Sequence, residues 1–169
     1  MSELTIGFVG LGNMGLPMCR RLVGAGFEVI AFDLRSEAVD EAVEAGARRG
    51  NGVAEIAATV DVLLTSLPHP RHVEAVMGDS GALAALRAGS VWVDLTTNRR
   101  ELVESLAATA PKGVEVVDSP VTGAVDGART GRLTLFAGGS PGALARVVPV
   151  LAHLGRVIEC GGLGTGNVV

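Results

Sequence analysis

The stretch LTIGFVGLGNMG, running from Leu4 to Gly15, carries the most informative pattern in this chain of 169 residues. Leu4–Val9 is a short apolar run that ends at a glycine, which is typical of a strand buried on both faces. From Met14 to Val23 the apolar residues recur at helical spacing. The pattern therefore predicts a strand, a glycine-rich turn and a helix in direct succession.

The same alternation continues along the chain. Short apolar runs predict strands over Leu4–Val9, Phe27–Asp33, Asp61–Ser66, Val91–Asp94, Val114–Asp118, Leu133–Ala137 and Arg156–Glu159. Helical spacing and helix-end signals predict helices over Met14–Val23, Ser36–Ala45, Val73–Met77, Ala82–Leu86, Asn98–Ala110 and Pro141–Leu154. Capping is expected from Ser36, from the capping-box pair Asn98 and Glu101, and from Ser140 before Pro141.

Strands that alternate with helices indicate βαβ units and a mostly parallel sheet with helices on both faces. We therefore predict an α/β fold of the doubly wound, Rossmann type, with residues 1–169 as one dinucleotide-binding domain. The length suits one domain with a substantial core.

Composition excludes several other classes of protein. An apolar fraction of 48 % with only 19 % charged residues excludes a disordered chain. A net charge of −4 argues against a nucleic-acid partner. The sequence shows neither an apolar run of membrane length nor a basic N-terminal signal, and Cys19 and Cys160 have no metal-ligand spacing. We expect a cytoplasmic protein without a metal and without a membrane partner.

The glycine loop has the spacing G-x-G-x-x-G between a strand and a helix. Gly10 allows the tight turn, Gly12 lets a pyrophosphate approach the backbone, and Gly15 lets the helix pack closely. The N-terminus of the helix offers unpaired N–H groups to the phosphates. The residues expected to bind the cofactor here are Gly10, Leu11, Gly12, Asn13, Met14 and Gly15.

Asp33 ends the second predicted strand, where the adenosine ribose of a dinucleotide sits. Its carboxylate can accept hydrogen bonds from the ribose hydroxyls and repels a 2′-phosphate by about 4 kcal/mol at an effective dielectric of 20. This favours NAD as the cofactor. Arg35 leaves NADP open, because a nearby arginine can accommodate the phosphate.

Three further segments follow predicted strands and should meet the glycine loop at one edge of the sheet. Leu67-Pro68 offers backbone groups and apolar contact, while the Thr97 hydroxyl could serve a ligand or cap a helix. The polar, glycine-containing stretch Pro120–Gly131 reads as a long functional loop.

The chain resembles the β-hydroxyacid dehydrogenases, which include 3-hydroxyisobutyrate dehydrogenase, tartronate semialdehyde reductase and, more distantly, 6-phosphogluconate dehydrogenase. The resemblance is carried along the whole chain by Gly7–Met18, Leu67-Pro68, Asp94–Thr97, Asp118–Ala124, Gly131–Leu135 and Gly161–Asn167. It implies a hydride transfer between a nicotinamide cofactor and a β-hydroxyacid.

By the same resemblance, Leu67, Pro68 and Thr97 would line the nicotinamide site, and Thr122, Gly123 and Ala124 would hold the substrate carboxylate. Thr122 stands where serine is usual in the family, and Ala124 where glycine is usual. Both residues are larger than the usual ones, so they narrow the expected substrate pocket. The identity of the hydroxyacid therefore stays open.

The family's catalytic lysine lies shortly after the last G-x-G, so its position falls beyond Val169, together with a helical second domain. Lys112 is the only lysine here, and we expect it in a solvated loop at the opposite edge of the sheet. No catalytic residue is therefore expected in this chain, which should bind the dinucleotide but show little turnover. A homo-oligomer is expected only for the full-length protein.

Several other residues carry weaker expectations. His69 and His72 read as structural or exposed, His153 as a helix-end residue, Asp126 as exposed, and Asp118 as an anchor for the turn that follows it. Two alternative functions remain: a non-catalytic NAD(P)-binding module, such as a redox sensor or scaffold, and an imine reductase.

Overall fold

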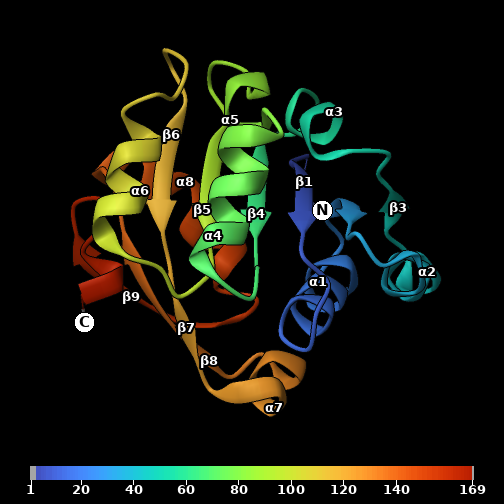
Figure 1. Ribbon diagram of the computed structural model, residues 1–169. Helices are drawn as coiled ribbons and strands as arrows, with labels where there is room; N and C mark the ends of the chain where they lie inside the picture. Colours follow the sequence, from blue (N-terminus) through green and yellow to red (C-terminus); the bar gives the residue numbers. More distant parts are fainter. Residues whose placement is uncertain (1–2, 169) are drawn as a thin grey trace.

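The strands and helices of the computed structural model, which describes residues 3–168, alternate along most of the chain (Figure 1). The strands are β1 (Thr5–Val9), β2 (Glu28–Phe32), β3 (Arg48–Arg49), β4 (Val62–Thr65), β5 (Val91–Asp94), β6 (Glu115–Asp118), β7 (Val121–Thr122), β8 (Leu133–Gly138) and β9 (Gly155–Gly161). The helices are α1 (Gly15–Gly24), α2 (Ser36–Ala45), α3 (Val53–Ala57), α4 (Pro70–Val73), the π-helix η1 (Glu74–Asp79), α5 (Ala82–Ala85), α6 (Arg100–Ala107), α7 (Ala124–Thr130), α8 (Pro141–Leu151) and the 3-10 helix η2 (Gly166–Val168).

All of these strands join one sheet in the order β3-β2-β1-β4-β5-β6-β8-β7, with β9 paired to β8. The pairs from β3 to β6 are parallel, whereas β8 runs antiparallel to β6 and β7. The chain builds outward from β1 to β3, then crosses over and builds outward from β4 in the other direction. Strand order therefore reverses between β1 and β4, the switch point at which open α/β sheets bind ligands.

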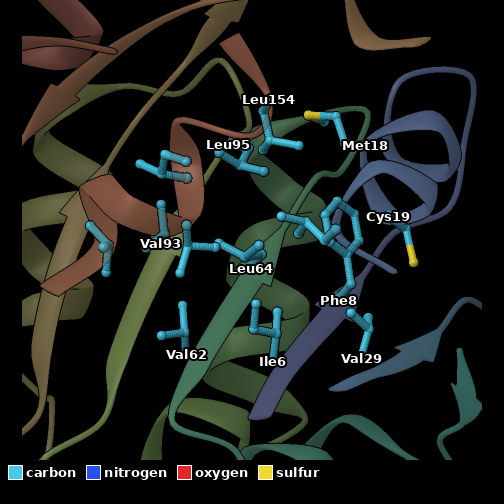
Figure 2. Close-up of a cluster of buried hydrophobic side chains, with 14 of the residues drawn as sticks. Ile6, Phe8, Met18, Cys19, Val29, Val62, Leu64, Val93, Leu95 and Leu154 are labelled. Carbon is cyan, nitrogen blue, oxygen red and sulfur yellow. The ribbon is translucent and has the colours of Figure 1, made fainter. Parts of the chain in front are cut away.

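Alternate side chains of the central strands β1, β2, β4, β5 and β6 enter two separate apolar clusters, one on each face of the sheet. Phe8 and Leu64 belong to the cluster beneath α1, α2 and α8, and Figure 2 shows them with Met18 of α1. Leu63 and Trp92 belong to the opposite cluster, which packs against α3, α4, η1, α5 and α6. Each such side chain contributes about 1.5–3 kcal/mol when fully buried. The predicted doubly wound, Rossmann-type α/β fold is confirmed.

Two of the predicted helix caps are wrong. Ser36 is the first residue of α2 rather than its cap, and the capping position belongs to Arg35, whose side chain makes no capping bond. Asn98 does not form a capping box with Glu101 either, because Arg99 occupies the capping position and Asn98 Oδ1 accepts the Arg99 N–H at 2.7 Å. The side-chain amide of Asn98 donates to the buried carboxylate of Asp94 at 2.9 Å. The third prediction is confirmed, since Ser140 Oγ accepts the Ala143 N–H at 3.1 Å at the start of α8.

The predicted irregular loop over Pro120–Gly131 is wrong for most of its length. Val121–Thr122 form β7 and Ala124–Thr130 form α7, and Gly131 caps the end of α7 with φ +73°. Most of α7 is exposed, so it lacks the apolar stripe that reveals a helix in a sequence. The short elements β3 and α3 were also not predicted, and both consist of too few residues to show a period.

Candidate functional site

Strand register brings the carboxyl ends of four neighbouring strands to one level. Val9 of β1 pairs with Thr65 of β4, Thr65 pairs with Asp94 of β5, and Asp94 pairs with Asp118 of β6. The segments that follow these residues therefore leave the sheet side by side, as expected for parallel strands. They include the glycine loop and the segments that begin at Ser66, Leu95 and Ser119.

The glycine loop is shaped so that side chains are excluded where the chain turns. Gly10 has φ +102°, and a Cβ on it would lie 2.0 Å from the Ser66 carbonyl oxygen. A Cβ on Gly15 would lie 1.9 Å from the Gly10 carbonyl oxygen. A Cβ on Gly12, by contrast, would meet nothing within 4 Å. Two of the glycines are required by the fold, whereas the third keeps open space beside the backbone.

The N-terminus of α1 opens onto this loop without a competing side chain. Met14 occupies the capping position with no side-chain hydrogen bond, and the first turn contains no acidic residue. The backbone N–H groups at a helix start carry partial positive charge and need partners. Here they are suited to an anionic group such as a pyrophosphate.

Asp33 joins the end of β2 to the glycine loop. One carboxylate oxygen accepts the Leu11 N–H at 2.7 Å, and the other accepts the Arg35 N–H at 2.8 Å. The Arg35 guanidinium also reaches back to the Leu11 carbonyl oxygen at 3.1 Å. The carboxylate keeps free lone pairs after these two bonds, so it can still accept a bond from a ligand hydroxyl.

The segment after β4 is held against the glycine loop. Leu67 is half-buried, and its Cδ2 lies 3.0 Å from the position that a Cβ on Gly10 would take. Its backbone N–H donates to Thr96 Oγ1 at 3.0 Å. Pro68 and Thr97 are both exposed, and the structure assigns no cap or other bond to the Thr97 hydroxyl among the described residues.

Buried Asp94 organises the turn after β5. It accepts hydrogen bonds from Thr65 Oγ1 at 2.9 Å, from the Thr96 N–H at 3.1 Å and from the Asn98 amide at 2.9 Å. Burial raises the pKa of the Asp94 carboxyl, although these hydrogen bonds act in the opposite direction. This carboxylate therefore sets the conformation of the turn rather than meeting solvent.

Thr122, Gly123 and Ala124 all lie on the surface where β7 leads into α7. Gly123 has φ +130° and Ala124 has φ +57°, and Ala124 is the one non-glycine residue with positive φ among residues 3–168. A left-handed conformation costs an L-residue roughly 1–2 kcal/mol. This strain would be absent with glycine, the residue that the resemblance to the family implies at this position.

Asp118 has a partner set that the sequence did not indicate. We expected it to anchor the following turn, but its oxygens accept the Gly164 N–H at 2.7 Å and the Asn167 N–H at 2.9 Å. The Asn167 side-chain amide adds a third bond at 3.0 Å. Burial raises the pKa of Asp118. Because its partners are 46 to 49 residues away, only the tertiary structure reveals them.

The remaining residues singled out in the sequence lie outside this edge or serve the fold. His69 accepts the Arg71 N–H at 3.3 Å at the start of α4, and His153 packs edge-on against Phe27 with 5.3 Å between ring centroids. Asp126 is exposed, and Lys112 lies in the turn that precedes β6, at the amino edge of the sheet.

Within residues 3–168, no group of His, Cys, Asp or Glu side chains could hold a metal ion, and no helix is long and apolar enough to cross a membrane.

A strand, a glycine loop, a helix and an acidic residue after the second strand define a dinucleotide-binding α/β unit. Residues 5–162 match the family described as the NAD binding domain of 6-phosphogluconate dehydrogenase, and the chain belongs to this family.

Similar proteins support the resemblance seen in the sequence. The chain is 38 % identical over 99 % of its length to 2-(hydroxymethyl)glutarate dehydrogenase of Eubacterium barkeri, of which it covers 56 %. It is 39 % identical over 96 % of its length to 3-hydroxyisobutyrate dehydrogenase of Pseudomonas aeruginosa, again covering 56 %. The chain thus spans about half the length of these curated relatives.

Solved structures agree with this assignment. Mycobacterium tuberculosis 3-hydroxyisobutyrate dehydrogenase, solved with L-serine, superposes with a TM-score of 0.93 at 36 % identity, over 99 % of this chain and 57 % of that one. An imine reductase from Myxococcus stipitatus has a TM-score of 0.87 at 18 % identity, over 99 % of this chain and 58 % of that one. The second likeness shows a shared fold only.

Proposed function

We propose that residues 1–169 form one dinucleotide-binding domain and that this domain is the cofactor-binding part of an oxidoreductase. The enzyme would transfer a hydride between a nicotinamide cofactor and a β-hydroxyacid similar to 3-hydroxyisobutyrate. The observation that carries the proposal is the glycine loop, where Gly12 leaves open space beside an uncapped helix start and Asp33 fixes Leu11. Family membership and the dehydrogenase relatives support the same conclusion.

Each part of the cofactor has a candidate partner among the segments that follow the carboxyl ends of the strands. The backbone from Gly10 to Gly15, including Leu11, Asn13 and Met14, would hold the pyrophosphate with the N-terminus of α1. Asp33 would accept the hydroxyls of the adenosine ribose. Leu67, Pro68 and Thr97 would line the nicotinamide end.

NAD is the preferred cofactor in this proposal. The Asp33 side chain is only 15 % exposed, and both of its oxygens are directed by backbone N–H groups. Its negative charge therefore stays where a 2′-phosphate would have to sit. The Arg35 guanidinium is 62 % exposed and close to that carboxylate, so NADP remains a weaker alternative ligand.

The substrate carboxylate is assigned to Thr122, Gly123 and Ala124. A hydroxyl and backbone N–H groups can bind a carboxylate without a charged side chain. The 3-hydroxyisobutyrate and 2-(hydroxymethyl)glutarate named for the relatives are both hydroxyacids, which is the reason for proposing this class.

The bound nicotinamide would supply the hydride acceptor, and the alcohol proton would need a general base. The only lysine of the sequence, Lys112, lies at the amino edge, away from the carboxyl ends of the strands. We therefore expect this polypeptide to bind the dinucleotide with little turnover, and we place oligomer formation in the full-length protein. A cytoplasmic location is part of the same proposal.

Titration calorimetry of the 169-residue chain with NADH and with NADPH tests the proposal. We expect binding of NADH and at least ten-fold weaker binding of NADPH, which corresponds to a charge repulsion of at least about 1.4 kcal/mol. A folded chain that binds neither nucleotide would refute the function, and tighter binding of NADPH would refute the cofactor preference. Turnover of 3-hydroxyisobutyrate should be assayed on the full-length protein.

A further inference from the structure

A partly buried chain of hydrogen bonds joins the last described segment to the turn after β5. The backbone N–H of Asn98 donates to Asn167 Oδ1 at 2.8 Å. The side-chain amide of the same asparagine residue, Asn167, donates to Asp118 at 3.0 Å. Asn167 thus uses both ends of its amide group, one toward Asn98 and the other toward Asp118. Figure 1 shows the C-terminal segment running beside α6, which begins directly after this turn.

The chain of bonds continues from Asn98 to the segment after β4. The Asn98 side chain donates to Asp94, which also accepts the Thr96 N–H, and Thr96 Oγ1 accepts the Leu67 N–H. Asp94, Thr96 and Asn98 are all at least nine-tenths buried. Replacing one of these bonds by water is therefore costly, because a buried polar group without a partner loses about 1–3 kcal/mol.

The last described segment, which includes Gly164, Gly166 and Asn167, packs against the sheet through its glycines as well as through polar contacts. A Cβ on Gly166 would lie 2.1 Å from the Phe136 carbonyl oxygen, and Gly164 has φ +91° beneath the Arg100 side chain. Gly164 itself donates its N–H to Asp118 at 2.7 Å. The segment therefore packs tightly against β6, β8 and the start of α6.

We propose that Asn167 and Asp118 are positioning residues for the nicotinamide end of the cofactor site, because they hold the turn that carries Thr97 in place from behind. Thr97 is the exposed neighbour of Asn98, and Leu67 is the other end of the same bond chain. Neither Asn167 nor Asp118 needs to touch the cofactor. The inference rests on the proposed function, since it assigns Leu67 and Thr97 to the nicotinamide.

A role limited to folding would have a different consequence. Loss of overall stability would weaken every ligand to a similar degree, whereas a displaced turn would affect only ligands that carry a nicotinamide. The proposed adenosine end of the site is formed by Asp33, which follows β2 on the other side of β1, and by Leu11, and within residues 3–168 it shares no hydrogen bond with this chain. ADP-ribose, which lacks the nicotinamide, is therefore the matched probe for NADH.

Calorimetry on wild type and Asn167→Ala, with both probes, tests the proposal. We expect the variant to bind NADH about ten-fold more weakly while ADP-ribose binding changes by less than about two-fold. Thr165→Val is the matched control, because it removes a bond inside the same segment, from Thr165 Oγ1 to the Gly162 carbonyl oxygen at 2.6 Å, without touching the chain to Asn98. The control should bind both probes as wild type does.

Equal weakening of both probes, or no weakening of either, would overturn the positioning role. A wild-type chain that binds neither probe would instead refute the proposed function itself. Hydrogen exchange on the wild-type chain is a second test, and its result does not depend on whether the variant folds. NADH should slow exchange at the backbone amides of Asn98 and Asn167 more than ADP-ribose does. Equal protection by the two probes would also overturn the proposal.

Discussion

The carboxylate of Asp33 and the backbone N–H of Leu11, 22 residues apart in the chain, are joined by a hydrogen bond of 2.7 Å. This bond ties the end of β2 to the middle of the glycine loop. The residue proposed to bind the ribose thus also sets the path of the backbone proposed to bind the pyrophosphate. The two ends of the proposed adenosine diphosphate site are therefore linked by a direct hydrogen bond.

Asp33→Asn should change the cofactor preference without unfolding the chain. The asparagine oxygen can still accept the Leu11 N–H, although the amide nitrogen would then replace the oxygen that accepts the Arg35 N–H, and the charge that repels a 2′-phosphate is gone. We expect the ratio of the NADPH and NADH dissociation constants to fall by at least about ten-fold, measured by calorimetry. Asp40→Asn on the exposed surface of α2, where Asp40 pairs with Arg49, is the control and should leave the ratio unchanged. An unchanged ratio in Asp33→Asn would contradict the assignment of this carboxylate.

Gly12→Ala should weaken cofactor binding while leaving the stability of the fold nearly unchanged. A methyl group on Gly12 meets nothing within 4 Å, so the fold should tolerate it, with a change in the free energy of unfolding below about 0.5 kcal/mol. The same methyl group would enter the space proposed for the pyrophosphate, and we expect NADH to bind at least about ten-fold more weakly. Gly24→Ala at the far end of α1 also meets nothing within 4 Å and should leave binding intact. Equal binding by the two variants would place the pyrophosphate elsewhere.

Ala124→Gly should stabilise the folded chain. Ala124 has φ +57°, which costs an alanine roughly 1–2 kcal/mol, while glycine loses about 0.5–1 kcal/mol more backbone entropy on folding. We expect a net gain of about 0.5–1 kcal/mol in the free energy of unfolding, measured in urea. Ala128→Gly in the buried part of α7 is the control and should destabilise the protein, since its φ is not positive. Destabilisation by Ala124→Gly would show that the alanine methyl group makes contacts that outweigh the strain.

Asp94→Asn should change how stability depends on pH. Burial raises the pKa of Asp94 above the ordinary value of 3.8, so the folded state binds this proton more tightly than the unfolded state. The contribution of Asp94 to stability is therefore largest below about pH 4 and is lost as pH rises through the folded-state pKa. The asparagine has no such dependence.

We therefore expect the wild type to lose stability relative to Asp94→Asn as pH rises from about 4 toward neutrality. Urea unfolding of both proteins at several pH values measures this difference. At every pH the variant also places an amide opposite the Asn98 amide, which costs about 1–3 kcal/mol. A difference that stays constant across the range would contradict the raised pKa.

Local pattern was sufficient for most of the sheet and for the glycine loop. Strands such as Val91–Asp94 are continuous apolar runs because both of their faces are covered, and that pattern is visible without any partner. The loop was equally clear, since Gly10 and Gly15 are required by contacts within a few residues of the turn or by φ itself. Ser140 was identified as a cap for the same reason, because its partner is only three residues away.

The sequence misled us at a buried asparagine and at a mostly exposed helix. Asn98 has the spacing of a capping residue, yet its amide donates to Asp94, which burial leaves in need of donors. Pro120–Gly131 looked irregular because α7 is mostly exposed and has little apolar periodicity.

The amino-acid sequence alone was enough to establish the βαβ alternation, the dinucleotide loop and the acidic residue at position 33, because these depend on short-range spacing and on burial. Folding in three dimensions was needed to bring Asp118 to Gly164 and Asn167, and Asn167 to Asn98. Hydrogen bonds between residues so far apart follow from the register of neighbouring strands, which pairs Asp118 with Gly138 and Gly138 with Gly161, and no local pattern encodes that register. The glycine loop can therefore be recognised in the sequence, whereas the hydrogen bonds that join Asn167 to Asn98 and Asp118 form only in the folded sheet.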